Sequence, residues 1–168
     1  MKTIYIVRHA KSSWDDLSLS DHDRPLLPVG VKRTQRVAKF LKSKNVRPGL
    51  LLSSSAVRAL ATARIIAGGI GYPPDKIKVE PRLYEASADT ILAELCALSD
   101  EVESVMIFGH NPTLTVFVNL YLKRSIDNLP TSGVVAVRFK ADKWENIAVA
   151  HFKVNFAVFP KMLKEKDG

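Results

Sequence analysis

The sequence has little cysteine and no long hydrophobic run. Its one cysteine, Cys96, lies in a helical pattern and cannot form a disulfide within the chain, which is typical of a reducing compartment. The first apolar run, residues 4–7, is too short for a signal-peptide core or a membrane span. No later uncharged run is long enough to cross a bilayer. We therefore expect a cytoplasmic protein that has no membrane partner.

Acidic residues are fewer than basic ones, 17 against 25, which gives a net charge of +8. Much of the excess lies in one predicted helix and in the C-terminal tail, at Lys32, Arg33, Arg36, Lys39, Lys42, Lys44, Lys161, Lys164 and Lys166. Both runs are also consistent with solvated faces. No zinc-ligand spacing, RNA-binding signature or interleaved aromatic residues accompany them, so we expect no nucleic-acid partner. A phosphorylated substrate fits the charge better.

The length of 168 residues, with 46% hydrophobic and 25% charged residues, predicts one globular domain over residues 1–168. The first of four helical patterns begins near Pro28, with Val31, Thr34, Ala38 and Leu41 on one face. The second spans 56–67 and ends before Gly68 and Gly69. The third follows Ser87, which can act as its N-cap, and the fourth runs from Asn111-Pro112 to about Leu122. Strand-like runs lie at 3–7, 50–53, 77–80, 105–109, 134–139 and 147–154. They alternate with the helical patterns until the last two runs, which suggest a hairpin or an adjacent pair of strands. This order predicts an α/β fold.

The first strand-like run ends directly on Arg8 and His9. A buried strand of an α/β sheet delivers its C-terminal residues to the crevice where such sheets bind ligands. A permanently charged guanidinium beside a side chain that titrates near neutral pH suits phosphate chemistry. Taken alone, the pair is more often an ordinary surface feature after a strand than part of a site.

Arg58 is a second candidate, because it shares a nearly apolar helix face with Thr62. The serines at 53–55 precede it and have hydroxyls that can cap the helix. Arg58 would then lie in the first helical turn, just beyond a strand end. An anion would bind there.

His110 repeats the placement of His9, since it follows an apolar strand and Gly109 and precedes a helix. A zinc site is the rival interpretation, but two histidines lack a third ligand and two arginines would repel a cation. We therefore expect no metal. Glu85 lies in a loop on the same side and is the best candidate proton donor, with Asp15, Asp16, Asp21 and Asp23 as weaker rivals.

Five motifs together resemble the histidine phosphatase superfamily, and most closely its SixA-like phosphohistidine phosphatase branch. They lie at 8–14, 21–26, 54–62, 83–86 and 109–112, within a resemblance that covers residues 3–140. The terminal strands and basic tail, 141–168, add little to it. Ala10 stands where most of the superfamily has glycine, a small substitution that is common in the SixA-like branch.

The resemblance implies a three-layer α/β/α sandwich with a mostly parallel sheet of about six strands, as in phosphoglycerate mutase. It implies that His9 is the nucleophile and forms a phosphohistidine intermediate. Arg8, Arg58 and His110 would hold the phosphoryl oxygens, and Arg24 resembles a further substrate-binding arginine or a loop-ordering residue. No cofactor is implied, and a phosphate or sulfate ion should fit the site.

The short segments between the motifs predict an open cleft, which suits phosphate on a protein side chain. We therefore expect a metal-independent phosphohydrolase acting on protein phosphohistidine. Glu85 sits where the superfamily's esterases carry a proton donor, so a small-molecule phosphomonoesterase is the first alternative. A phosphate-recognition module without catalysis is the second, and a mutase is less expected because no enclosing insertion is present.

Overall fold

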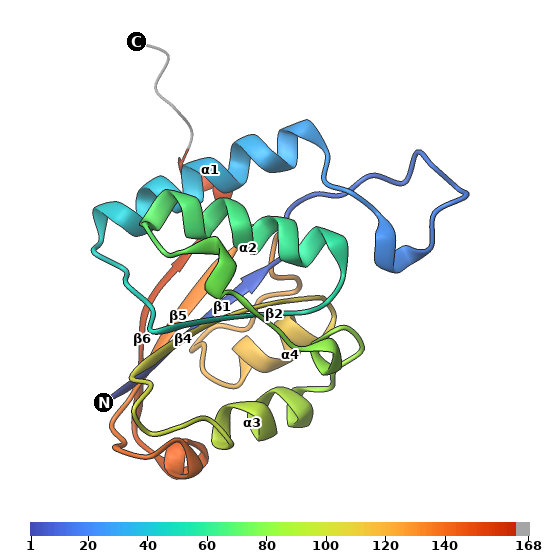
Figure 1. Cartoon of the computed structure of the whole chain (residues 1–168). Coiled ribbons are helices and arrows are strands. Elements are labelled where there is room, and N and C mark those ends of the chain that lie inside the picture. The colour runs from blue at the N-terminus through green and yellow to red at the C-terminus, as the bar shows by residue number, and fades with distance from the viewer. Residues whose placement is uncertain (164–168) are drawn as a thin grey trace.

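Six strands form one sheet in the order β3-β2-β4-β1-β5-β6 (Figure 1). The computed structural model describes residues 1–163. Neighbouring strands are parallel from β3 to β1, whereas β5 is antiparallel to both β1 and β6. The strands are β1 Lys2–Arg8, β2 Leu50–Ser53, β3 Lys78–Val79, β4 Ser104–Gly109, β5 Val134–Phe139 and β6 Phe152–Val158. The predicted mostly parallel α/β sheet is confirmed.

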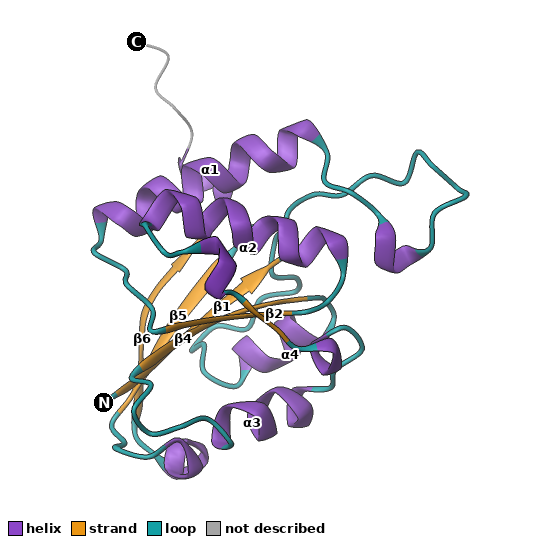
Figure 2. Ribbon diagram, in the orientation of Figure 1, coloured by secondary structure: helices purple, strands orange, loops and turns teal. Residues whose placement is uncertain are grey.

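Helices cover both faces of the sheet (Figure 2). On one face lie α1, Pro28–Ser43, and α2, Val57–Ile70, and on the other lie α3, Ala88–Cys96, and α4, Thr113–Asn119. Short 3-10 helices occupy Asp21–Asp23, Pro74–Lys76, Pro81–Leu83, Trp144–Val149 and Pro160–Leu163. The predicted three-layer sandwich is therefore confirmed. No helix in residues 1–163 is long and apolar enough to span a membrane.

Alternation along β1 builds the two cores. Ile4 and Ile6 pack in the cluster beneath α3 and α4, whereas Val7 packs on the opposite face with residues of α1 and α2. All three side chains are fully buried. This two-sided burial fixes which way each residue of β1 faces, and so delivers Arg8 and His9 to the end of the strand.

The second helix is longer than predicted, because Gly68 and Gly69 lie inside α2. The helix ends at Gly71, which adopts the left-handed conformation, φ 81°, that side chains disfavour. A Cβ atom at Gly69 would overlap the Cβ of Ala38 on α1, whereas one at Gly68 would meet nothing within 4 Å. Gly69 therefore permits the close packing of α1 against α2.

The expected strand at 147–154 is wrong in its first half. Residues Trp144–Val149 form a 3-10 helix, and β6 begins only at Phe152. Trp144 and Ile147 are buried three residues apart, which matches the 3-10 repeat, and the Trp144 indole N–H donates to the Val102 carbonyl at 2.7 Å. The buried Trp144 side chain therefore holds this segment in a 3-10 helix, although its β-branched composition favours a strand. The terminal strands do pair, antiparallel, as predicted.

Other differences are small. The strand expected at 77–80 is reduced to β3, and α4 ends before Leu122. On α1 the buried residues include Val37, whereas Val31 is only half-buried. Ser87 caps α3 as predicted, its side chain accepting from Thr90 N–H. Lys164 and Lys166 of the predicted basic tail lie outside the described residues.

Adjacent glycines of α2 provide a matched test of this packing. Gly69→Ala should destabilise the protein, because overpacking costs about 1–3 kcal/mol and outweighs the gain in helix propensity. Gly68→Ala meets no neighbour and should stabilise it by about 0.5–1 kcal/mol. Urea unfolding of both variants measures the difference. Equal effects would show that α1 and α2 do not pack closely at Gly69.

Candidate active site

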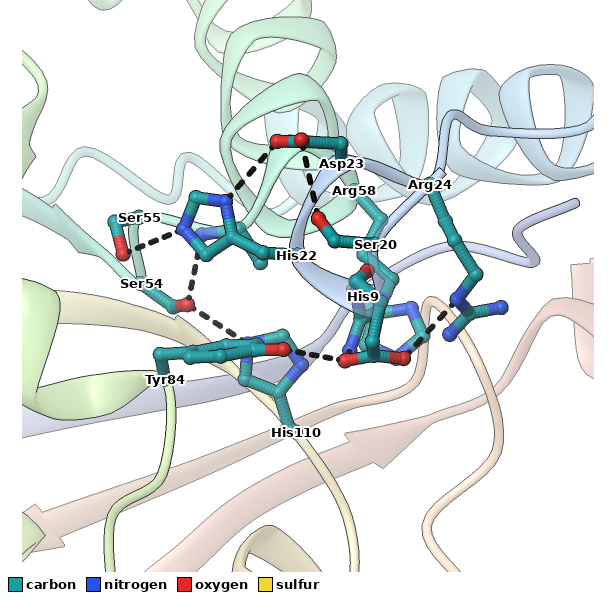
Figure 3. Close-up of polar contacts among 12 residues, drawn as sticks. His9, Ser20, His22, Asp23, Arg24, Ser54, Ser55, Arg58, Tyr84 and His110 are labelled. Carbon is teal, nitrogen blue, oxygen red and sulfur yellow. Dashed lines mark hydrogen bonds and ion pairs between the residues drawn. The ribbon is translucent and has the colours of Figure 1, made fainter. Parts of the chain in front are cut away.

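Parallel pairing of β1 with β4 brings the two predicted histidines together. The register places Arg8 opposite Gly109, so His9 and His110 follow the two strand ends side by side. Their ring centroids are 5.2 Å apart, as the close-up in Figure 3 illustrates. Two strand ends that lie 101 positions apart in the sequence therefore form one site.

A cleft of about 540 Å³ opens over these strand ends. It is lined by Arg8, His9, Lys11, Ser12, Trp14, Asp21, Arg24, Arg58, Tyr84, Glu85, His110, Asn111 and Thr131. All six residues predicted for the site are among them. The cleft is also bordered by the segment between β1 and α1, which contributes Trp14, Asp21 and Arg24.

The ring of His9 is oriented by its own backbone neighbour. Its Nδ1 lies 2.7 Å from the carbonyl oxygen of Ala10. A carbonyl can only accept, so Nδ1 carries the proton and Nε2 keeps its lone pair in the neutral ring. The side chain is 7% exposed. Burial first, and the charges of Arg58, Arg8 and Arg24 after it, lower the pKa of His9 to about 4, against the Ala10 hydrogen bond, which raises it.

His110 is held by Ser54. Its Nε2 lies 2.7 Å from Ser54 Oγ, which also accepts a hydrogen bond from Ala56 N–H at 3.2 Å. Ser54 can give its hydroxyl proton to Nε2, which places the ring proton on Nδ1. Burial lowers the pKa of His110 to about 3, with contributions from His9, Arg58 and Arg8, while Asp21 raises it.

Arg8 and Arg58 each use only some of their guanidinium N–H groups in hydrogen bonds. Arg8 donates from Nη1 to the Leu129 carbonyl at 2.9 Å. Arg58 donates to the Asp21 carbonyl and, from Nη2, to Asp21 Oδ2 at 3.0 Å. Three buried side-chain nitrogens within residues 1–163 have no hydrogen-bond partner, and all belong to this site: Arg8 Nε, Arg58 Nε and His110 Nδ1.

Thr62 ties the helix that carries Arg58 to the segment that carries His9. Its hydroxyl donates to the Arg58 carbonyl at 2.7 Å and accepts from Ala10 N–H at 2.8 Å. The expected capping of α2 by the serines at 53–55 is wrong. The N-cap is Ala56, without a side-chain cap, and Ser54 and Ser55 bond instead to His110 and His22.

Asp21 connects the arginines across the cleft, which the sequence did not indicate. Its carboxylate accepts from Arg24 Nε at 3.1 Å and from Tyr84 Oη at 2.6 Å, besides Arg58. The Tyr84 hydrogen bond and the two arginines lower the pKa of Asp21 to about 2, against burial, which raises it. Asp21 is therefore ionised at neutral pH and is a poor proton donor.

Tyr84 and Trp14 were not predicted as site residues. The Tyr84 ring packs edge-on against His110 with centroids 5.5 Å apart, and Trp14 stacks on the Arg24 guanidinium at 3.4 Å from its centroid. Both stand in the motifs that contain His9 and Glu85, which is the signal that could have indicated them.

The acidic residues considered as proton donors differ in whether they line the cleft. Glu85 is exposed and lines the cleft, whereas Asp15, Asp16 and Asp23 do not line it. Asp23 instead pairs with His22 at 3.3 Å. Both Glu85 and Asp21 are exposed, but only Asp21 forms ion pairs with the arginines of the cleft. The described residues contain no group of three or more histidine, cysteine or acidic side chains placed to hold a metal ion.

Comparisons with known proteins agree with this geometry. Residues 4–93 match the model of the histidine phosphatase superfamily (branch 1). An uncharacterized protein of Mycobacterium leprae is 33% identical over 153 residues, which cover 84% of this chain and 91% of the relative. A solved protein histidine phosphatase, SixA, in complex with tungstate superposes with a TM-score of 0.81 at 26% identity, covering 96% of this chain and 99% of its own.

A SixA structure from Agrobacterium tumefaciens is also similar, with a TM-score of 0.78, 25% identity and coverage of 95% of this chain and 98% of its own. The order of motifs, the sheet and the cleft thus agree with one family. The chain therefore belongs to the histidine phosphatase superfamily, and it is a phosphatase of the SixA-like type.

Proposed function

We propose that this phosphatase hydrolyses phosphohistidine in proteins through a phosphohistidine intermediate on His9, without a metal ion. The similar SixA structure is described as a protein histidine phosphatase. Its tungstate ligand resembles phosphate in shape and charge. The cleft is open to side chains presented by another protein, which supports a macromolecular substrate.

One observation carries the proposal: the cleft that contains the buried His9 is also lined by three residues that each have a buried side-chain nitrogen without a partner. Unpartnered buried N–H groups are rare because each costs the desolvation energy of a lost hydrogen bond. Arg8 Nε and Arg58 Nε are such groups, and so is His110 Nδ1 when Ser54 donates its hydroxyl proton to His110 Nε2. A phosphoryl group offers three peripheral oxygens, one for each donor.

In the first step, the lone pair of His9 Nε2 forms a bond to phosphorus while the P–N bond to the substrate imidazole breaks. The bonding pair leaves with the substrate ring, which is a neutral imidazole if it was protonated on its other nitrogen. Water then attacks the phosphorylated His9, and the P–N bond to Nε2 breaks to release phosphate. Transfer of charge to the phosphoryl oxygens is stabilised by Arg8, Arg58 and His110.

The low pKa values of the histidines serve this reaction. His9, with its pKa near 4, is unprotonated at neutral pH and available as a nucleophile. A bound phosphoryl group brings negative charge next to His110 and offsets the arginines, which raises the pKa of His110 in the complex. His110 can then strengthen its hydrogen bond to the phosphoryl group as negative charge develops on the phosphoryl oxygens.

Glu85 supports a second candidate, a small-molecule phosphomonoesterase. It is exposed, lines the cleft and is not paired in the way that Asp21 is. An alkoxide leaving group needs a placed acid, which a protonated imidazole does not.

The nucleophile is tested by single-turnover measurements with EDTA present on a histidine-phosphorylated protein and on p-nitrophenyl phosphate. The wild type should form an acid-labile phosphoenzyme and release phosphate. His9→Ala should lose at least about a thousandfold of this rate, as loss of a covalent nucleophile does in other enzymes. The exposed His151→Ala is the matched control. Binding of the phosphoprotein without phosphoenzyme would favour a recognition module, and loss of activity in EDTA would contradict metal independence.

Glu85→Gln separates the two substrate classes. On phosphohistidine peptide, kcat/KM should change less than about threefold, whereas on an alkyl phosphate it should fall about a hundredfold, the usual contribution of a general acid. Glu80→Gln, at a carboxylate that does not line the cleft, is the control. Equal losses on both substrates would remove the distinction, and a large loss on the peptide alone would make Glu85 part of P–N hydrolysis.

The ionisation of His9 is tested by NMR of histidine side chains labelled with 15N. Because its pKa is lowered from 6.5 to about 4, His9 should stay neutral from pH 7 down to about pH 5 and become protonated only below. Between these two pKa values the unfolded chain binds more protons than the folded one, so this group makes stability fall as pH falls from about 6.5 to 4. His9→Ala assigns the signal. A titration midpoint of His9 near pH 6.5 would contradict the burial of its ring beside the arginines.

A further inference from the structure

A second hollow, of about 320 Å³, adjoins the catalytic cleft. It is lined by Arg33, Arg36, Pro130, Thr131, Phe159, Pro160 and Lys161. Thr131 also lines the cleft that contains His9, so the two hollows share one wall. A chain segment bound in the cleft can therefore continue past Thr131 into the second hollow.

The basic residues of this hollow are held in a fixed relation to the cleft. Thr34, next to Arg33 on α1, is fully buried, and its hydroxyl bonds Ser132 Oγ at 2.8 Å. Ser132 in turn donates from its backbone N–H to the carbonyls of Arg8 and His9, at 3.1 and 3.2 Å. A continuous set of hydrogen bonds thus connects α1 to the nucleophile segment.

Within the part of the chain that the structure describes, the positive charge of the hollow is not balanced by acidic side chains in its lining. Arg33 and Arg36 are half-buried and stand three residues apart on α1, so two like charges share one helix face. Among residues 1–163, no aspartate or glutamate lines the hollow, and the ion pairs found there do not include Arg33, Arg36 or Lys161. By contrast, the buried Arg24 and Arg58 both pair with Asp21.

We propose that this hollow binds acidic side chains of the polypeptide segment that flanks the phosphorylated residue of the substrate. The inference rests on the proposed function and names the substrate class more closely. Arginine forks bind carboxylates in a bidentate manner. Phe159 and the two prolines provide apolar walls for the stems of such side chains, which a free phosphate ion would not need. A substrate anchored at both places has its phosphoryl group held against His9 for longer.

The test compares three synthetic phosphohistidine peptides, with a run of aspartates before the phosphohistidine, with the run after it, and with asparagines instead. The wild type should turn over one acidic peptide with a kcat/KM about tenfold above the neutral peptide, and high salt should reduce this gain. R33E/R36E should abolish the preference. K39E/K42E makes the same change of net charge with exposed lysines of the same helix that do not line the hollow, and should keep it.

Turnover of p-nitrophenyl phosphate by both double variants shows that the fold and the catalytic cleft are intact. Equal kcat/KM for all three peptides in the wild type would overturn the docking site while leaving the proposed function in place. Equal loss of preference in both double variants would also overturn it, because general steering by net charge would then explain the effect. Absence of His9-dependent turnover of every peptide would overturn the proposed function and the docking site together.

Discussion

The site depends on the parallel pairing of β1 with β4. That pairing sets Arg8 opposite Gly109, and it alone makes the residues that follow, His9 and His110, neighbours. A slip of one residue would turn Ile6 toward the face that now buries Val7, exchanging the residues of the two cores. Hydrophobic burial on both faces of the sheet therefore fixes the geometry of two polar residues at its end.

Asp21 offsets the repulsion among the three arginines of the site. Arg8, Arg58 and Arg24 all disfavour protonation of His9, and their mutual repulsion in a partly buried place also costs free energy. Asp21 accepts from Arg24 Nε and from the two terminal nitrogens of Arg58, and leaves Arg58 Nε without a partner. It thus orients these cations while the inner donor remains available for an anion. Tyr84 donates to the same carboxylate and packs against His110, so one network positions both sides of the cleft.

Features encoded in short stretches of sequence were predictable, and features set by distant contacts were not. Strand β2 and the Ser87 cap were found from apolar runs and capping chemistry within a few residues. The need for glycine at position 69 inside α2 depends on Ala38 of α1, which leaves no room for a side chain there, and the 3-10 helix at Trp144 depends on the distant Val102 carbonyl. Likewise, Asp21 and Tyr84 meet across 63 positions, and no local pattern reports such a pair.

The lowered pKa of His9 also bears on which bond the site can break. A ring with a pKa near 4 is a weak base, but in the proposed reaction phosphoryl transfer passes through a loose transition state, in which the basicity of the attacking group matters little. The leaving group matters more, because it carries the bonding electrons away. An imidazole protonated on its far nitrogen leaves as a neutral molecule, whereas an alkoxide needs a proton at the moment of departure. Asp21, with its pKa near 2, has no proton to give at neutral pH. This agrees with the proposed function, because transfer from a phosphorylated imidazole is the chemistry that needs least from a proton donor.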